Sequence, residues 1–204
     1  MNFNRNSSYF KDLFQQSYEK YGYSHSALQW TSRQTMDNRF EALARTIDFE
    51  NKSVLDVGCG FGDIIPFIEK KTKKFNYLGV DLVEKIVLEA RKQYPKYEFT
   101  SGDYFANPIK RVFDIVLTSG TLNGNLGPET LEFRLKAIEV MWEHTCAICA
   151  FNMLGSHPQP GNDPGYLVHY ADSLEILSFC LTLTPKLVFI QDYDPEDFTV
   201  VMFK

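Results

Sequence analysis

The sequence predicts an α/β fold: a seven-stranded, mostly parallel sheet with an antiparallel last strand and helices on both faces. Three observations support this prediction. From residue 53 onward, short apolar runs typical of strands alternate with segments of helical periodicity. A glycine-rich turn at 58–62 joins the first of these strands to the first helix. The last two strands, 186–190 and 197–203, lie too close in sequence for the crossover that parallel neighbours need.

The first 48 residues precede this alternation, and we expect them to form a helical cap segment within a single domain spanning 1–204. Phe10, Phe14 and Tyr18 recur at helical spacing, which predicts a helix over about 7–20. A turn follows at Gly22. A second amphipathic helix is predicted over 36–47, where apolar residues share one face.

The alternating elements can be placed from their apolar patterns. Strands are predicted over 53–57, 77–81, 97–100, 112–118 and 146–153, before the closing pair. Helices are predicted over 63–71, from 83 to just before Pro95, from Pro128 to 142, and after Asp172. The connection 154–166 is long and rich in Pro and Gly, which is typical of a binding loop or lid.

Composition narrows the functional classes. The chain has a net charge of −5, which offers no electrostatic reason to expect a nucleic-acid partner. No apolar run approaches the roughly 20 residues that span a bilayer, so we expect no membrane partner. The N-terminus lacks the apolar core of a secretory signal, and we expect a cytoplasmic location.

The four cysteines are interpreted as buried, reduced thiols. Cys146 and Cys149 form a C-x-x-C within a predicted strand, where their side chains would point to opposite faces. No second metal-binding pair accompanies them, so no metal site is expected. Cys59 is expected to be the more exposed thiol because it lies in the glycine turn.

The glycine turn carries the strongest functional signal. The run 54–63 reads V-L-D-V-G-C-G-F-G-D, with glycines that permit close approach of a ligand to the backbone. Its G-x-G-x-G spacing differs from the G-x-G-x-x-G dinucleotide fingerprint. Asp56, at the strand end, would repel a pyrophosphate but suit an ammonium or sulfonium group.

This run resembles the first motif of the class I S-adenosylmethionine-dependent methyltransferases, an apolar strand followed by D-x-G-x-G-x-G. The resemblance implies a Rossmann-like fold and S-adenosyl-L-methionine as cofactor, with S-adenosyl-L-homocysteine as product and no metal. It assigns cofactor binding to Asp56, Gly58, Cys59, Gly60 and Gly62. The whole chain is also similar to small bacterial methyltransferase-like proteins without an assigned substrate.

Further cofactor contacts are expected at successive strand ends, where open α/β sheets bind ligands. Asp81 matches the family's ribose-binding acid, although an Asp there can also cap the next helix. Asp103 matches the acid that accepts the adenine amine, although an Asp in a turn often bonds its own backbone. The resemblance extends these roles to neighbouring and more distant positions: Leu82 on the adenine face, the Tyr104 amide, Thr118 and Ser119 beside the methyl group, and Arg39 toward the methionyl carboxylate.

We expect the contacts with the methyl acceptor to come from residues 1–35, an aromatic and polar segment that we call the leader, and from the long loop after the fifth strand. Candidate substrate contacts are Tyr23, Trp30, His157, Tyr166, His169 and Tyr170. His169 is the preferred proton acceptor because histidine as a residue type is the usual general base near neutral pH, and Tyr170 is the second catalytic candidate. The motifs of DNA amino-methyltransferases, cytosine C5 enzymes and metal-dependent catechol-type enzymes are missing after the fourth and fifth strands.

These observations predict a methyltransferase that transfers a methyl group from S-adenosylmethionine to a small-molecule acceptor by in-line displacement. Such a reaction needs alignment and exclusion of water more than an obvious base. The alternatives are a catalytically silent S-adenosylmethionine-binding module or partner subunit, an aminopropyl transferase, and a nicotinamide-dependent dehydrogenase.

Overall fold

The computed structural model describes residues 3–204, with side chains from residue 7 onward. Its strands are β1 (Lys52–Val57), β2 (Phe75–Asp81), β3 (Glu98–Ser101), β4 (Phe113–Ser119), β5 (Thr145–Ser156), β6 (Ala171–Asp172), β7 (Leu187–Ile190) and β8 (Asp197–Phe203). Its α-helices are α1 (Phe3–Tyr21), α2 (Arg33–Arg45), α3 (Ile65–Glu69), α4 (Glu84–Gln93), α5 (Thr130–Glu143) and α6 (Ser173–Leu183). Short 3₁₀ helices cover His25–Leu28, Thr121–Asn123 and Gly127–Glu129.

The strands form one sheet in the order β3-β2-β1-β4-β5-β8-β7. β1 to β5 pair in parallel, and β8 runs antiparallel to both of its neighbours, β5 and β7. The closing hairpin predicted from its short connection is thereby confirmed. The sequence did not predict β6, a two-residue strand that pairs with the end of β5 and has no periodic pattern of its own.

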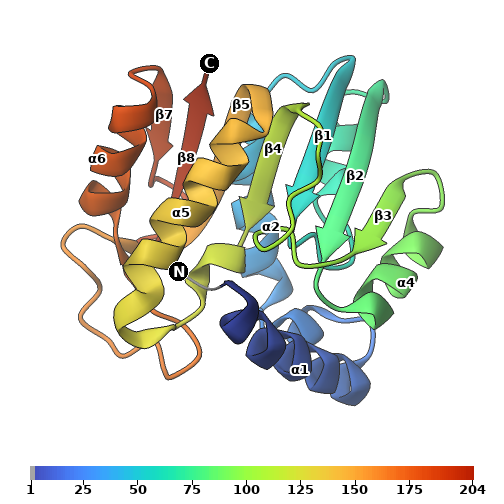
Figure 1. The fold of residues 1–204 in the computed structure, drawn as a ribbon, viewed down its shortest axis with the longest axis horizontal. Coiled ribbons are helices and arrows are strands. Elements are labelled where there is room, and N and C mark those ends of the chain that lie inside the picture. Colours follow the sequence, from blue (N-terminus) through green and yellow to red (C-terminus); the bar gives the residue numbers. More distant parts are fainter. Residues whose placement is uncertain (1–2) are drawn as a thin grey trace.

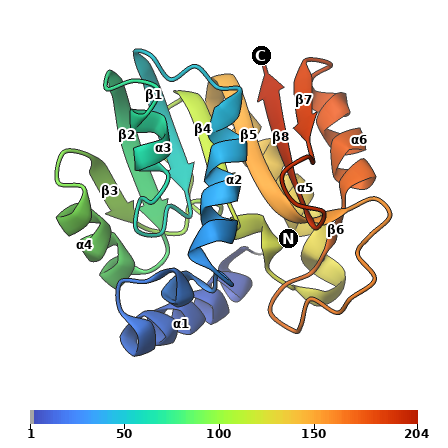
Figure 2. The same ribbon diagram turned by 180° about the vertical axis from the view of Figure 1, so that it is seen from behind.

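Helices cover both faces of the sheet, α5 and α6 on one and α2 and α3 on the other (Figures 1 and 2). Buried strands that are covered on both faces are apolar at consecutive positions. In β1, Val54 packs toward α2 and α3, whereas Leu55 and Val57 pack into the cluster on the α5 side. The alternation of side-chain direction along each strand therefore divides the core into two layers.

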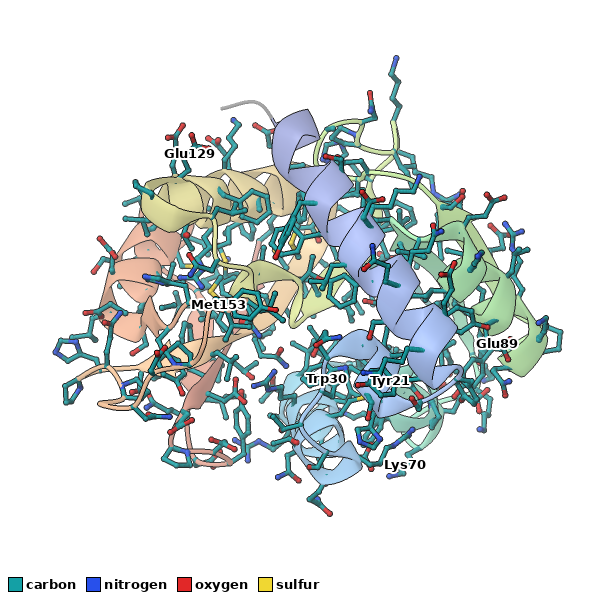
Figure 3. The ribbon with its side chains drawn as sticks, turned by 90° about the horizontal axis from the view of Figure 1, so that it is seen from below. Tyr21, Trp30, Lys70, Glu89, Glu129 and Met153 are labelled. Carbon is teal, nitrogen blue, oxygen red and sulfur yellow. The ribbon has the colours of Figure 1, made fainter. Side chains whose placement is uncertain are left out.

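The leader lies across the carboxyl ends of the parallel strands. Viewed toward that edge, α1 crosses the molecule between α5 and α4, and Trp30 lies beside the start of α2 (Figure 3). The Tyr18 hydroxyl donates to Glu89 on α4 at 3.3 Å, and Lys85 pairs with Glu19 at 2.6 Å. These contacts hold α1 over the edge where α/β sheets bind ligands.

Several boundaries differ from the sequence prediction. α1 begins before residue 7, and α2 begins at Arg33 because Ser32 caps it by accepting the Thr35 amide at 3.1 Å. α3 is only Ile65–Glu69, since the turn with its glycines continues to residue 64. No helix among residues 3–204 is long and apolar enough to cross a membrane.

Candidate functional site at the carboxyl ends of the strands

The turn after β1 is anchored to the end of β2. The amides of Gly58 and Cys59 both donate to the carbonyl of Val80, at 2.8 and 3.0 Å. Gly58 has φ +69°, and a Cβ there would lie 2.0 Å from Oγ1 of Thr121 in the segment after β4. A side chain at residue 58 is thus excluded by both conformation and space. The turn joins the ends of β1, β2 and β4 in one place.

Asp81 is fixed at the end of β2 by two backbone donors. Its carboxylate accepts the Gly60 amide and the Val83 amide, each at 3.0 Å. Asp81 does not cap α4, whose N-cap is Val83 without a side-chain cap; its bond to the Val83 amide belongs to the turn before the helix. The four lone-pair sites on its carboxylate leave room for further donors. Burial raises the pKa of Asp81 above its ordinary value.

Asp56 lies at the end of β1 with 4% of its surface exposed. The Tyr77 hydroxyl donates to its carboxylate at 2.6 Å. Burial raises the pKa of Asp56 to about 7, and the charge of Asp81 contributes in the same direction. The carboxylate faces a pocket in which a cation would restore its ionised form.

Asp103 and Tyr104 follow β3 and border the same pocket. Asp103 accepts the Ala106 amide at 3.0 Å, as expected for a turn Asp, and the Ser7 hydroxyl of α1 donates to its other oxygen. The Tyr104 ring is buried, and its hydroxyl has no hydrogen-bond partner among the described residues.

These groups line one cavity of about 230 Å³ between the strand ends and the leader. Its charged lining residues are Asp56, Asp63, Asp81, Asp103 and Arg39. Its apolar and aromatic walls come from segments far apart in the sequence: Phe10, Phe14, Leu28, Trp30, Phe133, Leu154, Leu167 and Val168. The cavity is therefore apolar overall, with carboxylates concentrated at the ends of β1 to β3.

The cations near the cavity already have partners. Arg39, from α2, donates through Nε to buried Asp197, and its guanidinium carbon lies 4.8 Å from the centre of the Trp30 ring. Asp63 pairs with Arg33 at 3.2 Å. Asp56, Asp81 and Asp103 have no ion-pair partner among the described residues. The expected contact of Arg39 with a methionyl carboxylate stays a prediction.

Of the two residues predicted to contact the cofactor from the end of β4, only one lines the cavity. Ser119 lines the cavity and donates to Asn152 at 3.0 Å. Thr118 does not line it, because its side chain points into the sheet and donates to the carbonyl of Val57 at 2.5 Å. Leu82, Gly60 and Cys59 all border the cavity as expected, whereas Gly62 packs against Phe99.

The two catalytic candidates lie outside the cavity. Tyr170 is buried and donates to Glu196 at 2.9 Å. The His169 ring is not among the lining groups, and its carbonyl accepts from buried Arg134. Their neighbours Leu167 and Val168 face the cavity instead. Of the other substrate candidates, Trp30 lines the cavity, but Tyr23, His157 and Tyr166 do not.

The expected exposure of the thiols is wrong. Cys59 is buried with 7% exposed, since its sulfur packs against Gly79 of β2, where a Cβ would lie 2.7 Å away. Cys146 is the exposed thiol, and Cys149 and Cys180 are buried. Among the described residues, no group of three or more His, Cys, Asp or Glu is arranged to hold a metal ion.

Known proteins that resemble this chain in sequence or in fold are named as methyltransferases. Residues 54–140 match the family described as a methyltransferase domain. A protein of Mycobacterium tuberculosis with a provisional methyltransferase name is 25% identical over 166 residues, 74% of this chain and 93% of its own length. Another such protein, from Invertebrate iridescent virus 6, is 32% identical over 68 residues, 33% of this chain and only 26% of the viral protein.

The fold also matches solved structures. Magnesium protoporphyrin IX methyltransferase from Synechocystis PCC 6803, solved with bound SAH, superposes with a TM-score of 0.67 at 15% identity, covering 98% of this chain and 99% of the other. At this identity the likeness establishes a shared fold. The matched range 54–140 contains Asp56, Asp81 and Asp103, which line the cavity at the carboxyl ends of the strands.

Proposed function

We propose that this chain, which carries a methyltransferase domain with the class I fold, transfers a methyl group from S-adenosylmethionine to a small-molecule acceptor by in-line displacement. The observation that carries the proposal is the charge of the cavity. Asp56, Asp81 and Asp103 lie at successive strand ends without a cationic partner among the described residues. A ligand with hydroxyl and amine donors and a net positive charge suits this set, whereas a pyrophosphate would be repelled.

Each of the three carboxylates can be assigned to one group of the cofactor. Asp81 has acceptor sites left for two ribose hydroxyls, and Asp103 would accept the adenine amine when Ser7 yields its place. Leu82 would pack on the adenine face, and Asp56 would face the methionyl ammonium.

When bound, the cofactor supplies an electrophilic methyl group on its sulfonium. The chain's own contribution is alignment and exclusion of water. α1 covers the cavity at the carboxyl ends of the strands (Figure 1), and the apolar walls disfavour solvent around a reacting pair. Because the cavity is mostly apolar and its charged groups are chiefly carboxylates, it supports a small molecule as acceptor rather than a polyanionic nucleic acid. The four free thiols support a reducing, cytoplasmic location.

Two measurements test the proposal. Thermal unfolding is followed with S-adenosylmethionine, S-adenosylhomocysteine or NAD, and we expect stabilisation by the first two alone. A shift with NAD alone would contradict the assignment. Transfer of labelled methyl groups is then measured into the ultrafiltrate and the retained macromolecules of a bacterial extract. After unreacted S-adenosylmethionine is separated by chromatography and a reaction without the protein is subtracted, labelled product in the ultrafiltrate supports a small acceptor, and labelled product only in macromolecules refutes it. Binding without transfer supports the silent module.

A further inference from the structure

Asn123 is a buried polar residue that borders the cavity and that the roles above do not use. It follows β4 in the 3₁₀ helix Thr121–Asn123 and has 5% of its surface exposed. Its backbone is held on both sides. The amide donates to Gly120 at 3.1 Å, and the carbonyl accepts the His169 amide at 3.0 Å.

The orientation of the Asn123 side chain follows from its hydrogen bond. The Leu154 amide donates to Oδ1 at 2.9 Å, and because an N–H needs an acceptor, the bonded atom must be the oxygen. Nδ2 therefore points away from Leu154. It lies beside Gly120, where a Cβ would be 3.9 Å from it. No described residue accepts a hydrogen bond from Nδ2. Nδ2 is not among the fully buried atoms that lack a partner, so it is accessible from the cavity and free to donate to a ligand atom there.

The apolar lining residues around Asn123 define a part of the cavity that we call the acceptor compartment. Its walls are apolar: Phe10, Leu126, Phe133, Leu154, Leu167 and Val168. None of these side chains carries a charge or titrates. Two backbone contacts hold the walls together, a bridge between Gly124 and Val168 and the bond from the Asn125 amide to Leu167 at 3.0 Å.

We propose that Asn123 is a binding residue that selects the methyl acceptor: Nδ2 donates to a carbonyl, ether or ring-nitrogen atom of an uncharged, largely apolar small molecule. The inference rests on the proposed function and adds the class of acceptor to it. The apolar walls disfavour a charged acceptor, because an ion there would lose its hydration without gaining a partner. Because Oδ1 already accepts the Leu154 amide, a molecule in this compartment forms its hydrogen bond with the Asn123 side chain by accepting from Nδ2.

A matched pair of small probes tests this role. 4′-Fluoroacetophenone accepts a hydrogen bond, and 4-fluorocumene has nearly the same shape without the oxygen. Binding of each is measured by fluorine NMR, both to the free protein and to its complex with S-adenosylhomocysteine, at a pH of about 8, where an aspartate ionises. Wild type is compared with Asn123→Asp, which keeps the acceptor for Leu154 and removes the donor, and with Asn123→Ala. Asn125→Asp, whose side chain lies off the cavity, is the control.

Wild type is expected to prefer the ketone over the hydrocarbon by about fivefold or more. Both Asn123 variants should lose that preference without weaker hydrocarbon binding, and the control should keep it. The inference is overturned if Asn123→Ala retains the preference, if both probes weaken together, or if neither probe binds wild type. Since the free protein is measured too, failure of S-adenosylhomocysteine to bind would refute the proposed function and still leave the role of Asn123 decided by the probes.

Discussion

Asp56 offers a pH test of the cofactor assignment. Its raised pKa, about 7, means that the neutral acid predominates in the free protein below that pH and the carboxylate above it. A ligand whose ammonium faces Asp56 selects the carboxylate, so binding releases a proton and affinity rises with pH. S-adenosylhomocysteine, which carries the ammonium without the sulfonium, isolates this contact.

The size of the effect follows from the pKa. Between pH 6 and pH 7.5 the ionised fraction of a group with a pKa of about 7 rises from about 0.1 to about 0.75. If only the ionised form binds, the dissociation constant falls by roughly eightfold over that interval. Isothermal titration calorimetry at both pH values, in buffers of different ionisation enthalpy, measures the affinity and the released proton together.

Asp56→Asn provides the matched control, because the amide keeps an oxygen for the Tyr77 hydroxyl and cannot ionise. The variant should bind more weakly at pH 7.5 and show less than twofold change between the two pH values. The reasoning is refuted if wild-type affinity is independent of pH over this range, or if the variant retains the wild-type slope.

Three further predictions concern stability and reactivity. Tyr104→Phe should raise the free energy of unfolding by about 1 kcal/mol, because it removes a buried hydroxyl without a partner. Tyr77→Phe should lower the free energy of unfolding by about 2 kcal/mol, because the buried Asp56 loses its hydrogen-bond donor. Urea unfolding of both variants measures the two opposite changes. Gly58→Ala should lower the free energy of unfolding by at least about 2 kcal/mol, because φ is positive and the new Cβ would clash with Thr121. As a control, Gly102→Ala should lower it by less than about 0.5 kcal/mol in the same assay, because the space around residue 102 is open. Under native conditions Cys146 should react with a thiol reagent well before the other three cysteines, and equal rates measured by mass spectrometry would contradict the observed burial.

The fold was predictable because its signals are local. The apolar strands, the glycine turn and the short link before β8 each follow from a few adjacent residues, and together they determined the parallel sheet and its antiparallel strand. The two-residue β6 has no such signal and forms only because the loop returns to the end of β5. The length of α3 depended on where the turn ends, which tertiary contacts decide.

The carboxylate side of the cavity was predictable. Asp56 and Asp81 lie at the ends of recognisable strands and Asp103 follows the next one, and all three line the cavity, whereas their roles toward the cofactor stay predictions. The walls of the acceptor compartment come from α1, α5, the end of β5, the segment before α5 and the loop before β6, so only the fold brings them together. The helical spacing of Phe10 and Phe14 was the available signal for α1, although it did not say which surface they cover.

The loop after β5 shows the same limit. Its composition predicted a binding loop, but not which residues face inward. His169 was preferred for its chemistry, and the structure instead turns Leu167 and Val168 toward the cavity. Asn123 had no sequence signal at all, since its importance depends on a hydrogen bond to Leu154 that fixes its amide.

The most direct test of the central claim is a crystal structure of the protein with S-adenosylhomocysteine. We expect density for the ligand along the ends of β1, β2 and β3, with its ribose hydroxyls on Asp81, its adenine amine on Asp103 and its ammonium toward Asp56. Ser7 should then have left Asp103. Density for the ligand elsewhere, or a cavity in which those three carboxylates contact no part of it, would contradict the account.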